Sequence, residues 1–388
     1  MKKYRLLNNK TITKTCAIIL IVIMCFIFAS CGENNEDFSY MVDTTYQSTN
    51  VEIINKDKYG TTAIKINEER DIKVLQITDV HLGNGSLTVK KDRKAINAVC
   101  RLIEDAKPDL IILTGDIVYP NSSITGSSNN LAALKIIADL MESYKTPWTM
   151  CFGNHDAEWM ADYDKTALCD LLEDENYQYC IFDRGPEDID GMGNQVINVY
   201  NSDDTFNSSI FVFDNGDYAG SSQMSGYQAI TDAQTNWYKS EIEKMNAGEG
   251  KTIQSFVYFH VPLKEYEIAW NLYREGSEEV KYFFGWANES NEKISSSDET
   301  GSFFETAALL GSTKATFCGH NHLNDFSIEY KGIRLTFSKS IDYTAYFLVN
   351  IANKTEQRGS TTLLIKGLNS EMETDFEIYQ TKLVDIEE

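Results

Sequence analysis

The five histidines of this 388-residue chain share one sequence context, an apolar run that leads into a polar turn. They are His81, His155, His260, His320 and His322. Asp and Asn residues stand in the same turns, where an apolar strand should end. Imidazole and carboxylate groups gathered at strand ends suit divalent metals of hard to borderline character. The sequence therefore predicts a metal centre.

The acidic and amide side chains of these turns are the other half of the predicted donor set. Asp79 stands two residues before His81, and Asp116 closes the run LTGD. Asn154 and Asp156 flank His155 in the segment GNHD. Two divalent ions about 3.5–4 Å apart must share a ligand, and an anionic carboxylate can bridge them. Asp116 is the natural candidate for this bridge.

Each of these residues, taken alone, has a simpler explanation. Asp79 and Asp116 could be helix N-caps that follow strands. His260, on the apolar strand FVYFH, could be a hydrogen-bonded core histidine, and Asn154 could be a turn residue. Only their joint arrangement favours a metal centre over these alternatives.

The spacing within the motifs agrees with a compact centre. Alternate positions of an extended segment face the same side, so His320 and His322 could serve one site while Asn321 points away. Glycines precede Asp116, Asn154 and His320. These glycines would let the backbone turn tightly close to the metals.

The elements that must position these residues follow from the apolar periodicity. Residues 73–79, 109–116 and 148–154 read as strands, with helices expected over 90–106 and 131–144 between them. This βαβαβ order predicts parallel strands with helices on their faces. Polar groups of such a sheet collect at the carboxyl ends of its strands, where Asp79, Asp116 and Asn154 stand.

The second half of the chain is more mixed. Strands are expected over 208–216 and 252–261 around a helix over 232–245. Several alternating runs after His322 suggest an antiparallel region that closes a second sheet; they cover 325–338, 345–352, 360–366 and 375–380. The aromatic segment 261–318 is either a substrate-facing lid or a helix with a packed surface loop. We expect one domain over residues 51–388, because no Pro- or Gly-rich break divides them.

In order, the motifs D-x-H, G-D, G-N-H-D, a lone His and G-H-x-H resemble the calcineurin-like metallophosphoesterase superfamily. The sequences HVPLKEYEIAW after the lone histidine and GHNHLNDF resemble its purple acid phosphatase-related branch that lacks the large N-terminal domain. The resemblance implies a mixed α/β fold, a four-layer α/β/β/α sandwich of two mixed sheets. It also implies two divalent metal ions, Fe, Mn or Zn.

The resemblance also implies roles for the individual residues. With Asp116 as the bridge, Asp79, His81 and His322 would complete the first metal position, and Asn154, His260 and His320 the second. His155 would lie near the leaving group, oriented by Asp156. The implied reaction is hydrolysis of a phosphate ester by attack of a metal-bridging hydroxide.

One residue distinguishes this chain from the purple acid phosphatases proper, which carry D-x-G and a metal-binding Tyr in G-D-x-x-Y. Tyr119 stands at the spacing of that Tyr, but His81 replaces the Gly. We therefore predict His81 as the ligand and Tyr119 as a packing residue close to the centre.

The N-terminus predicts export. Basic residues precede a short apolar run over 16–29, which suits a signal peptide better than a membrane span of roughly 20 residues. The sequence Phe28-Ala29-Ser30-Cys31 resembles a bacterial lipobox, so residues 1–30 are predicted to be a signal peptide and Cys31 to be lipidated. The alternative is an ordinary secretory signal. Residues 31–50 are polar and predict a flexible tether.

Charge and cysteine content limit the partners. The formal charge is −23, and removal of the five basic residues of the signal peptide takes it to −28. Such an acidic chain should repel nucleic acid, so we expect a small phosphorylated substrate instead. Cys169 and Cys180 flank a helix-to-strand turn and could pair in an oxidising compartment.

A different class of function also fits these observations. The chain could be a lipid-anchored binding or adhesion module on a phosphoesterase scaffold, since a fold alone does not determine a function. A degenerate scaffold should have lost a metal ligand, and none is missing from the motifs. A metal-storing lipoprotein is a third possibility, but it would have no use for His155, which the resemblance places off the metals.

Overall fold

The computed structural model describes residues 46–48, 50–215, 218–219, 226–346 and 357–387. The predicted signal peptide, Cys31 and most of the predicted tether lie outside these residues, as does most of the alternating run 345–352. Within the described part of the chain, no helix has both the length and the apolarity needed to cross a membrane.

A five-stranded mixed sheet contains the predicted βαβαβ unit. Its strands, in spatial order, are β14 (Phe376–Lys382), β13 (Gly359–Ile365), β3 (Ile72–Ile77), β4 (Leu110–Thr114) and β5 (Trp148–Cys151). The last three are parallel, as predicted, while β13 is antiparallel to both β3 and β14. The carboxyl ends of β3, β4 and β5 therefore meet at one edge.

A nine-stranded mixed sheet forms the second half of the fold. In spatial order its strands are β1 (Val51–Ile54), β2 (Thr62–Ile66), β6 (Gln195–Tyr200), β7 (Phe206–Val212), β8 (Gln254–Tyr258), β10 (Thr313–Cys318), β12 (Ile333–Phe337), β11 (Ser327–Tyr330) and β9 (Val280–Phe284). The central strands β7, β8, β10 and β12 are parallel, and β2 is parallel to β6. The pairs β1–β2, β6–β7, β12–β11 and β11–β9 are antiparallel.

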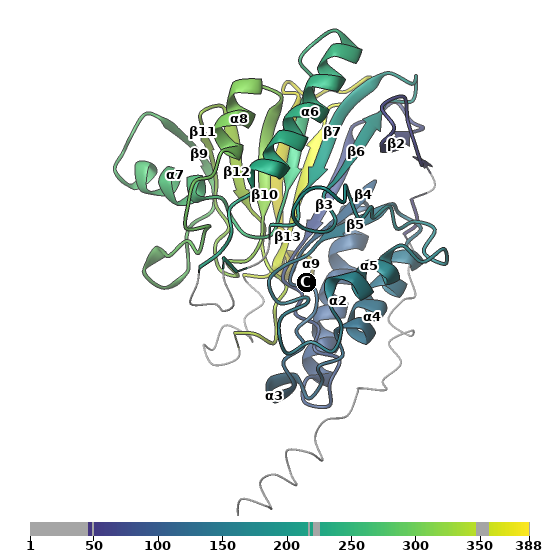
Figure 1. The fold of residues 1–388 in the computed structure, drawn as a ribbon, viewed down its shortest axis with the longest axis vertical. Helices are drawn as coiled ribbons and strands as arrows, with labels where there is room; N and C mark the ends of the chain where they lie inside the picture. Colours follow the sequence, from purple (N-terminus) through teal and green to yellow (C-terminus); the bar gives the residue numbers. More distant parts are fainter. Residues whose placement is uncertain (1–45, 49, 216–217, 220–225, 347–356, 388) are drawn as a thin grey trace, which may run out of the picture.

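Helices cover the outer faces of both sheets (Figure 1). Beside the five-stranded sheet lie α2 (Val89–Ala106), α4 (Asn130–Ser143), α5 (Lys165–Leu172) and α9 (Leu383–Glu387). Beside the nine-stranded sheet lie α6 (Asp232–Glu249), α7 (Lys264–Arg274) and α8 (Phe303–Leu310). The short helix α3 (Ser122–Thr125) and the 3₁₀ turn η3 (Ser290–Glu292) lie in connections.

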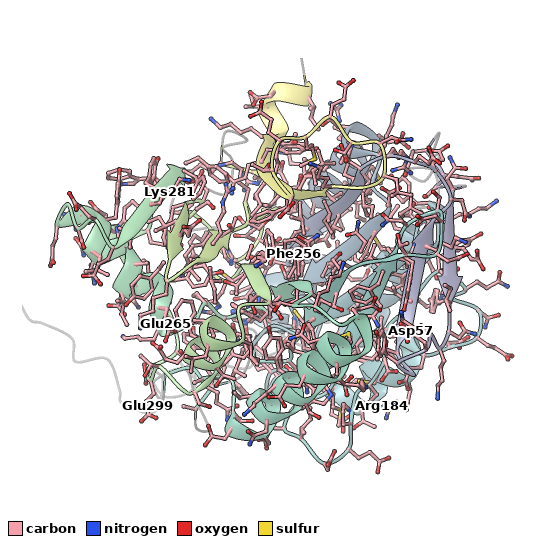
Figure 2. The ribbon with its side chains drawn as sticks, turned by 90° about the horizontal axis from the view of Figure 1, so that it is seen from above. Asp57, Arg184, Phe256, Glu265, Lys281 and Glu299 are labelled. Carbon is pink, nitrogen blue, oxygen red and sulfur yellow. The ribbon has the colours of Figure 1, made fainter. Side chains whose placement is uncertain are left out.

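Three apolar clusters hold these layers together. One lies between the five-stranded sheet and its helices, and another between the nine-stranded sheet and its helices. The third contains residues of both sheets, such as Val74 and Phe256, and fills the space between them. Figure 2 shows Phe256 in the interior, with Lys281 and Arg184 nearer the outline. The fold is thus the predicted α/β/β/α sandwich of two mixed sheets.

The C-terminal strands differ from the prediction. The runs after His322 were expected to close the second sheet, and β11 and β12 do join it. However, β13 and β14 return to the first sheet, where β13 pairs with β3. Alternation of polar and apolar residues predicts a strand, but it does not identify the neighbouring strand.

The segment 261–318 is a packed insertion. Helix α7 buries Tyr266, Ala269 and Trp270, and β9 pairs with β11 at the edge of the nine-stranded sheet.

Cys169 and Cys180 do not form a disulfide: all five cysteines of the described residues are free, and the thiol of Cys169 lies beside Met192 instead.

Candidate metal centre

All seven predicted metal ligands lie just after the carboxyl ends of parallel strands. Asp79 and His81 follow β3, Asp116 follows β4, Asn154 follows β5, His260 follows β8, and His320 and His322 follow β10. The two sheets therefore contribute to one site, because the ends of β3, β4 and β5 meet those of β8 and β10.

The first ligand set consists of Asp79, His81 and His322, with Asp116 beside it. The Nε2 atoms of His81 and His322 are 3.1 Å apart. Oδ1 of Asp79 lies 3.4 Å from Nε2 of His322, and Oδ2 of Asp116 lies 3.6 Å from Nε2 of His81. The facing ligand atoms of these four buried residues all lie within 4.8 Å of one another, which is compact enough for one metal ion.

The second ligand set contains His260 and His320, again with Asp116. Nε2 of His260 is 3.3 Å from Nδ1 of His320 and 3.2 Å from Oδ2 of Asp116. The same carboxylate oxygen thus faces both sets. This is the geometry that a bridging ligand of two metal ions requires.

Asn154 is the remaining predicted ligand of the second set. Its Nδ2 donates to the hydroxyl of Tyr218 (2.9 Å), which leaves Oδ1 as the free acceptor. Oδ1 is buried and has no hydrogen-bond partner within the described part of the chain. Because an unsatisfied buried oxygen costs free energy, its position fits a metal ligand. The donor set as a whole, imidazole with carboxylate and amide oxygen, suits Fe, Mn or Zn.

Strained backbone positions surround the centre. Four ligands, Asp79, His81, Asp116 and His320, adopt positive φ angles of 53°, 50°, 52° and 70°. Such angles are uncommon for residues other than glycine and concentrate at functional sites. For His320 this corrects the expected extended segment: the GHNH motif is a turn. Asn321 points away from the metals as predicted, and its Oδ1 accepts from the N–H of Ser295.

All three predicted glycine positions require a residue without a Cβ. A Cβ on Gly115 would lie 2.6 Å from Nδ1 of His260. A Cβ on Gly153 would lie 2.2 Å from Oδ1 of Asp116, and one on Gly319 would lie 2.0 Å from Oγ1 of Thr78. The motif glycines therefore bring the backbone close to the ligands.

The pKa shifts favour the ligand forms of His81, His320 and Asp116, whereas, against the effect of burial, neighbouring carboxylates raise the pKa values of His260 and His322. Burial lowers the pKa of His81 to about 4 and that of His320 to about 3, so both imidazoles are neutral near pH 7. Although burial opposes it, the charge of His260 holds the pKa of Asp116 well below its usual range. Neutral imidazole and ionised carboxylate are the metal-binding forms of these side chains.

Outer contacts fix the orientation of two histidines. Nδ1 of His260 lies 2.8 Å from the carbonyl of Thr114, and Nδ1 of His322 lies 3.0 Å from Oδ2 of Asp342. Each contact directs the Nε2 atom to the centre. The sequence analysis missed Asp342, because it stands alone in the segment KSIDYT and belongs to none of the motifs.

Tyrosine rings pack against the histidines. Tyr119 lies edge-on to His81 at 5.2 Å and to His155 at 5.1 Å, which agrees with the predicted packing role. Tyr346 stacks on His322 at 4.2 Å, and Tyr227 lies edge-on to His320 at 4.3 Å. These rings restrict the rotation of the imidazoles.

His155 lies beside the two ligand sets, and its partner differs from the one predicted. Its backbone N–H donates to Oδ1 of Asp116 (2.8 Å), and its Nδ1 lies 3.2 Å from Oε2 of Glu158. Burial lowers the pKa of His155, but Asp116 and Glu158 outweigh this and raise it. The sequence analysis missed Glu158, three residues after His155, because Asp156 stood directly next to the histidine.

Asp156 was predicted to orient His155, and the structure gives its carboxylate another position. It accepts four backbone N–H groups, those of Gly153, Asp116, Ile117 and Val118, at 2.7–3.0 Å. Asp156 therefore ties the loop after β4 to the loop after β5, and so fixes the backbone around Asp116.

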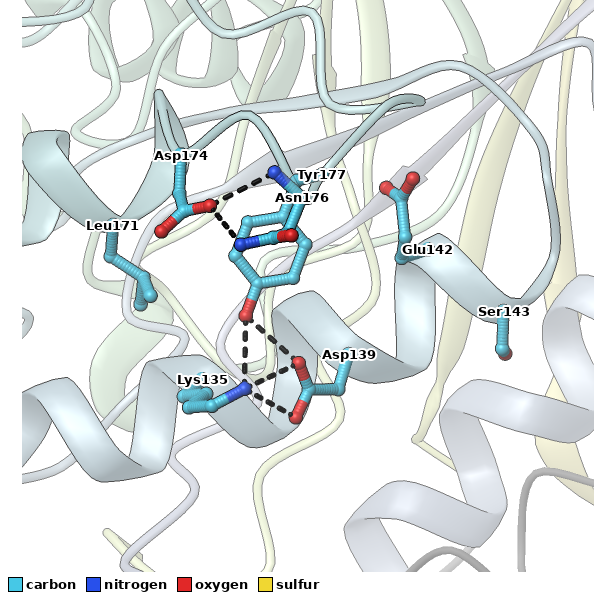
Figure 3. Close-up of a pocket in the computed structure, with 8 residues that line it drawn as sticks. All are labelled: Lys135, Asp139, Glu142, Ser143, Leu171, Asp174, Asn176 and Tyr177. Carbon is cyan, nitrogen blue, oxygen red and sulfur yellow. Dashed lines mark hydrogen bonds and ion pairs between the residues drawn. The ribbon is translucent and has the colours of Figure 1, made fainter.

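The basic side chains that could hold a substrate phosphate, in the segment after His260, are already paired with acids. Lys264 and Arg274, which follow His260, form ion pairs with Glu267 (2.5 Å) and Glu292 (3.0 Å). A surface pocket between α4 and α5 contains Lys135, bonded to Asp139 and Tyr177 (Figure 3). Since Asp174 and Glu142 also line it, this pocket is acidic and does not suit a phosphate group.

Comparison with known proteins agrees with this geometry. Two Arabidopsis thaliana proteins, named probable inactive purple acid phosphatases 28 and 29, are 26% and 28% identical to the chain over 73% and 71% of its length and 73% of theirs. The phosphatase DCR2 of Saccharomyces cerevisiae is 26% identical over 69% of the chain and 47% of its own length. A crystal structure of a dimetal phosphatase from Danio rerio, LOC 393393, has the same fold: it covers 81% of the chain and 99% of its own, with a TM-score of 0.50 and 9% identity. Residues 72–324, which include all the predicted ligands, match the family described as calcineurin-like phosphoesterase, and the chain belongs to that family.

Proposed function

We propose that this protein hydrolyses phosphate esters at a dinuclear metal centre held by the two ligand sets and Asp116. The observation that carries the proposal is the shared Oδ2 of Asp116, which lies 3.6 Å from His81 and 3.2 Å from His260. Bound metal ions would attract the phosphoryl oxygens and lower the pKa of a water molecule.

Individual residues of the chain would then have separate roles in the reaction. The ligand sets fix the place of the phosphoryl group, and Asp156 keeps the loops after β4 and β5 together. His155 is the one histidine outside both ligand sets, and its Nδ1 faces Glu158. Its other nitrogen is therefore the candidate donor of a proton to the leaving oxygen.

The completeness of the centre supports an enzyme over a binding module. A degenerate scaffold should lack a ligand, yet all the predicted Asp and His ligands are present and cluster around Asp116. The plant relatives are named probable inactive proteins, so activity has to be measured on this chain itself.

The test combines metal analysis with phosphomonoester and phosphodiester substrates. We expect two metal equivalents per chain and turnover that Asp116→Ala abolishes together with metal binding. Asp139→Ala, which removes a surface carboxylate paired with Lys135, should keep both. Unchanged turnover in Asp116→Ala, or no metal and no turnover under any supplied metal, would refute the proposal.

We further propose that the protein is exported and anchored to the outer face of a bacterial cell membrane, or to the outer membrane, through a lipid at Cys31. Two acyl chains, rather than one, give stable anchoring. Cys31→Ala should move the protein from the membrane fraction to the soluble fraction. Unchanged partitioning would refute the anchor.

A further inference from the structure

Glu158 faces the one histidine that the metal ions do not need. Its Oε2 lies 3.2 Å from Nδ1 of His155, and its side chain is only 5% exposed. The two residues are three positions apart in the turn that follows β5. The inference below rests on the proposed function.

The unsatisfied atoms of this pair point to a hydrogen bond between them. Nδ1 of His155 and Oε1 of Glu158 are both buried, and neither has a hydrogen-bond partner within the described part of the chain. The 3.2 Å contact is close enough for an ion pair but is not aligned as a hydrogen bond. Catalytic hydrogen bonds are often loose without substrate and tighten when it binds.

The surroundings leave Glu158 as the group that sets the direction of the ring. Tyr119 stands perpendicular to the imidazole of His155, with ring centres 5.1 Å apart, and His81 lies 5.3 Å away. Asp156 is not available for this purpose, because its carboxylate already accepts four backbone N–H groups.

We propose that Glu158 is a positioning residue that directs Nε2 of His155 to the leaving oxygen, and that the pair suits the site to phosphate esters of alkyl alcohols. In the reaction a bond forms between phosphorus and the oxygen of water, which loses a proton to solvent, while the bond to the alkyl oxygen breaks. The proton of His155 Nε2 passes to that oxygen, which departs as a neutral alcohol, and solvent later returns a proton to His155.

The chemical class of substrate follows from the need for this proton. An alkoxide is a poor leaving group, so proton donation contributes most to its departure. A nitrophenolate is stable without a proton and gains little. A site that holds a directed acid is therefore of most use with alkyl esters.

The test compares Glu158→Gln with wild type on p-nitrophenyl phosphate, phenyl phosphate and glycerol phosphate. We expect kcat to fall by about 10–100-fold on glycerol phosphate, by less on phenyl phosphate and little on p-nitrophenyl phosphate. Glu142→Gln is the matched control, since Glu142 is a half-buried carboxylate that binds the N–H of Tyr179 instead. It should leave all three rates unchanged.

A double-mutant cycle separates positioning from a merely structural role. If Glu158 acts through His155, then adding Glu158→Gln to His155→Ala should cause no further loss. Equal losses on all three esters, a loss that persists in the His155→Ala background, or loss of bound metal would overturn the inference. Turnover of glycerol phosphate that Glu158→Gln does not slow would overturn it and leave the proposed function intact. A wild-type protein that hydrolyses no ester would overturn both.

Discussion

The two ligand sets are alike in their histidines and differ in the groups that support them. His322 of the first set is held by the carboxylate of Asp342, whereas His260 of the second is held by the neutral carbonyl of Thr114. The remaining non-histidine ligands differ in the same way, because Asp79 is anionic and Asn154 is neutral.

The hydrogen bonds to the loops that carry the ligands differ in the same way. After His81, the N–H of Gly83 donates to the buried carboxylate of Asp92 (3.0 Å). At His260, the N–H donates to the side-chain amide oxygen of Asn215 (3.1 Å). The groups behind His322 and Gly83 are thus carboxylates, whereas those behind His260 are a neutral carbonyl and a neutral amide.

This asymmetry has a consequence for metal affinity. A cation is stabilised by nearby negative charge, and carboxylates behind a ligand make the ligand a stronger donor. We therefore expect the first position to bind its ion more tightly, and a chelator to empty the second position first. The shared carboxylate of Asp116 makes the two affinities interdependent but does not make them equal.

Asp342→Asn should produce the largest effect on this difference. It keeps the shape of the side chain but removes the charge beside His322, so metal affinity at the first position should fall by about 10–100-fold. Metal content measured during a chelator titration should then lose its tighter step. Asp139→Asn is the control, since Asp139 is a surface carboxylate that pairs with Lys135. Two unchanged steps in Asp342→Asn would mean that the carboxylate does not set the affinity.

The sequence was sufficient to predict that the Asp and His residues cluster, but not which groups support them. Asp79, Asp116 and Asn154 follow apolar runs with helices between them, so local periodicity alone places them at one sheet edge. Asp342 and Glu158 have no such local signal. Asp342 meets His322 only because the segment after β12 runs beside Thr78 and Asp79, and this depends on tertiary packing.

The lack of a local signal for tertiary contacts also explains where the predicted fold was wrong. The periodicity of 360–366 and 375–380 predicted strands correctly, but pairing of β13 with β3 is a non-local choice between two sheets. For Asp156, adjacency to His155 suggested a contact, while the tight turn after β5 directs the carboxylate to backbone N–H groups instead. Element types were thus predictable, and contacts between distant segments were not.

The pH dependence of stability tests the role of Asp92, whose carboxylate accepts the N–H of Gly83 in the loop after His81. Burial raises the pKa of Asp92 from 3.8 to about 6, so the folded protein keeps this proton at a pH where the unfolded chain has lost it. The contribution of Asp92 to stability is therefore largest below about pH 4 and is lost as the pH rises to about 6, by roughly 3 kcal/mol. Asp92→Asn should flatten this slope in denaturant unfolding measured between pH 4 and 7. An equal slope in both proteins would exclude Asp92 as its source.

Tyr218→Phe should have the smallest effect, and only at the second position. The Tyr218 hydroxyl accepts a neutral hydrogen bond from Nδ2 of Asn154, and such a bond contributes about 1 kcal/mol. Its loss frees the amide of Asn154 to rotate, so affinity at the second position should fall by about fivefold. Tyr227→Phe is the control, because Phe keeps the ring that packs on His320. The same chelator titration should show weaker binding at the second position and unchanged binding at the first in Tyr218→Phe. Weaker binding at the first position would mean that the two positions share their support, contrary to the separation of charged and neutral contacts.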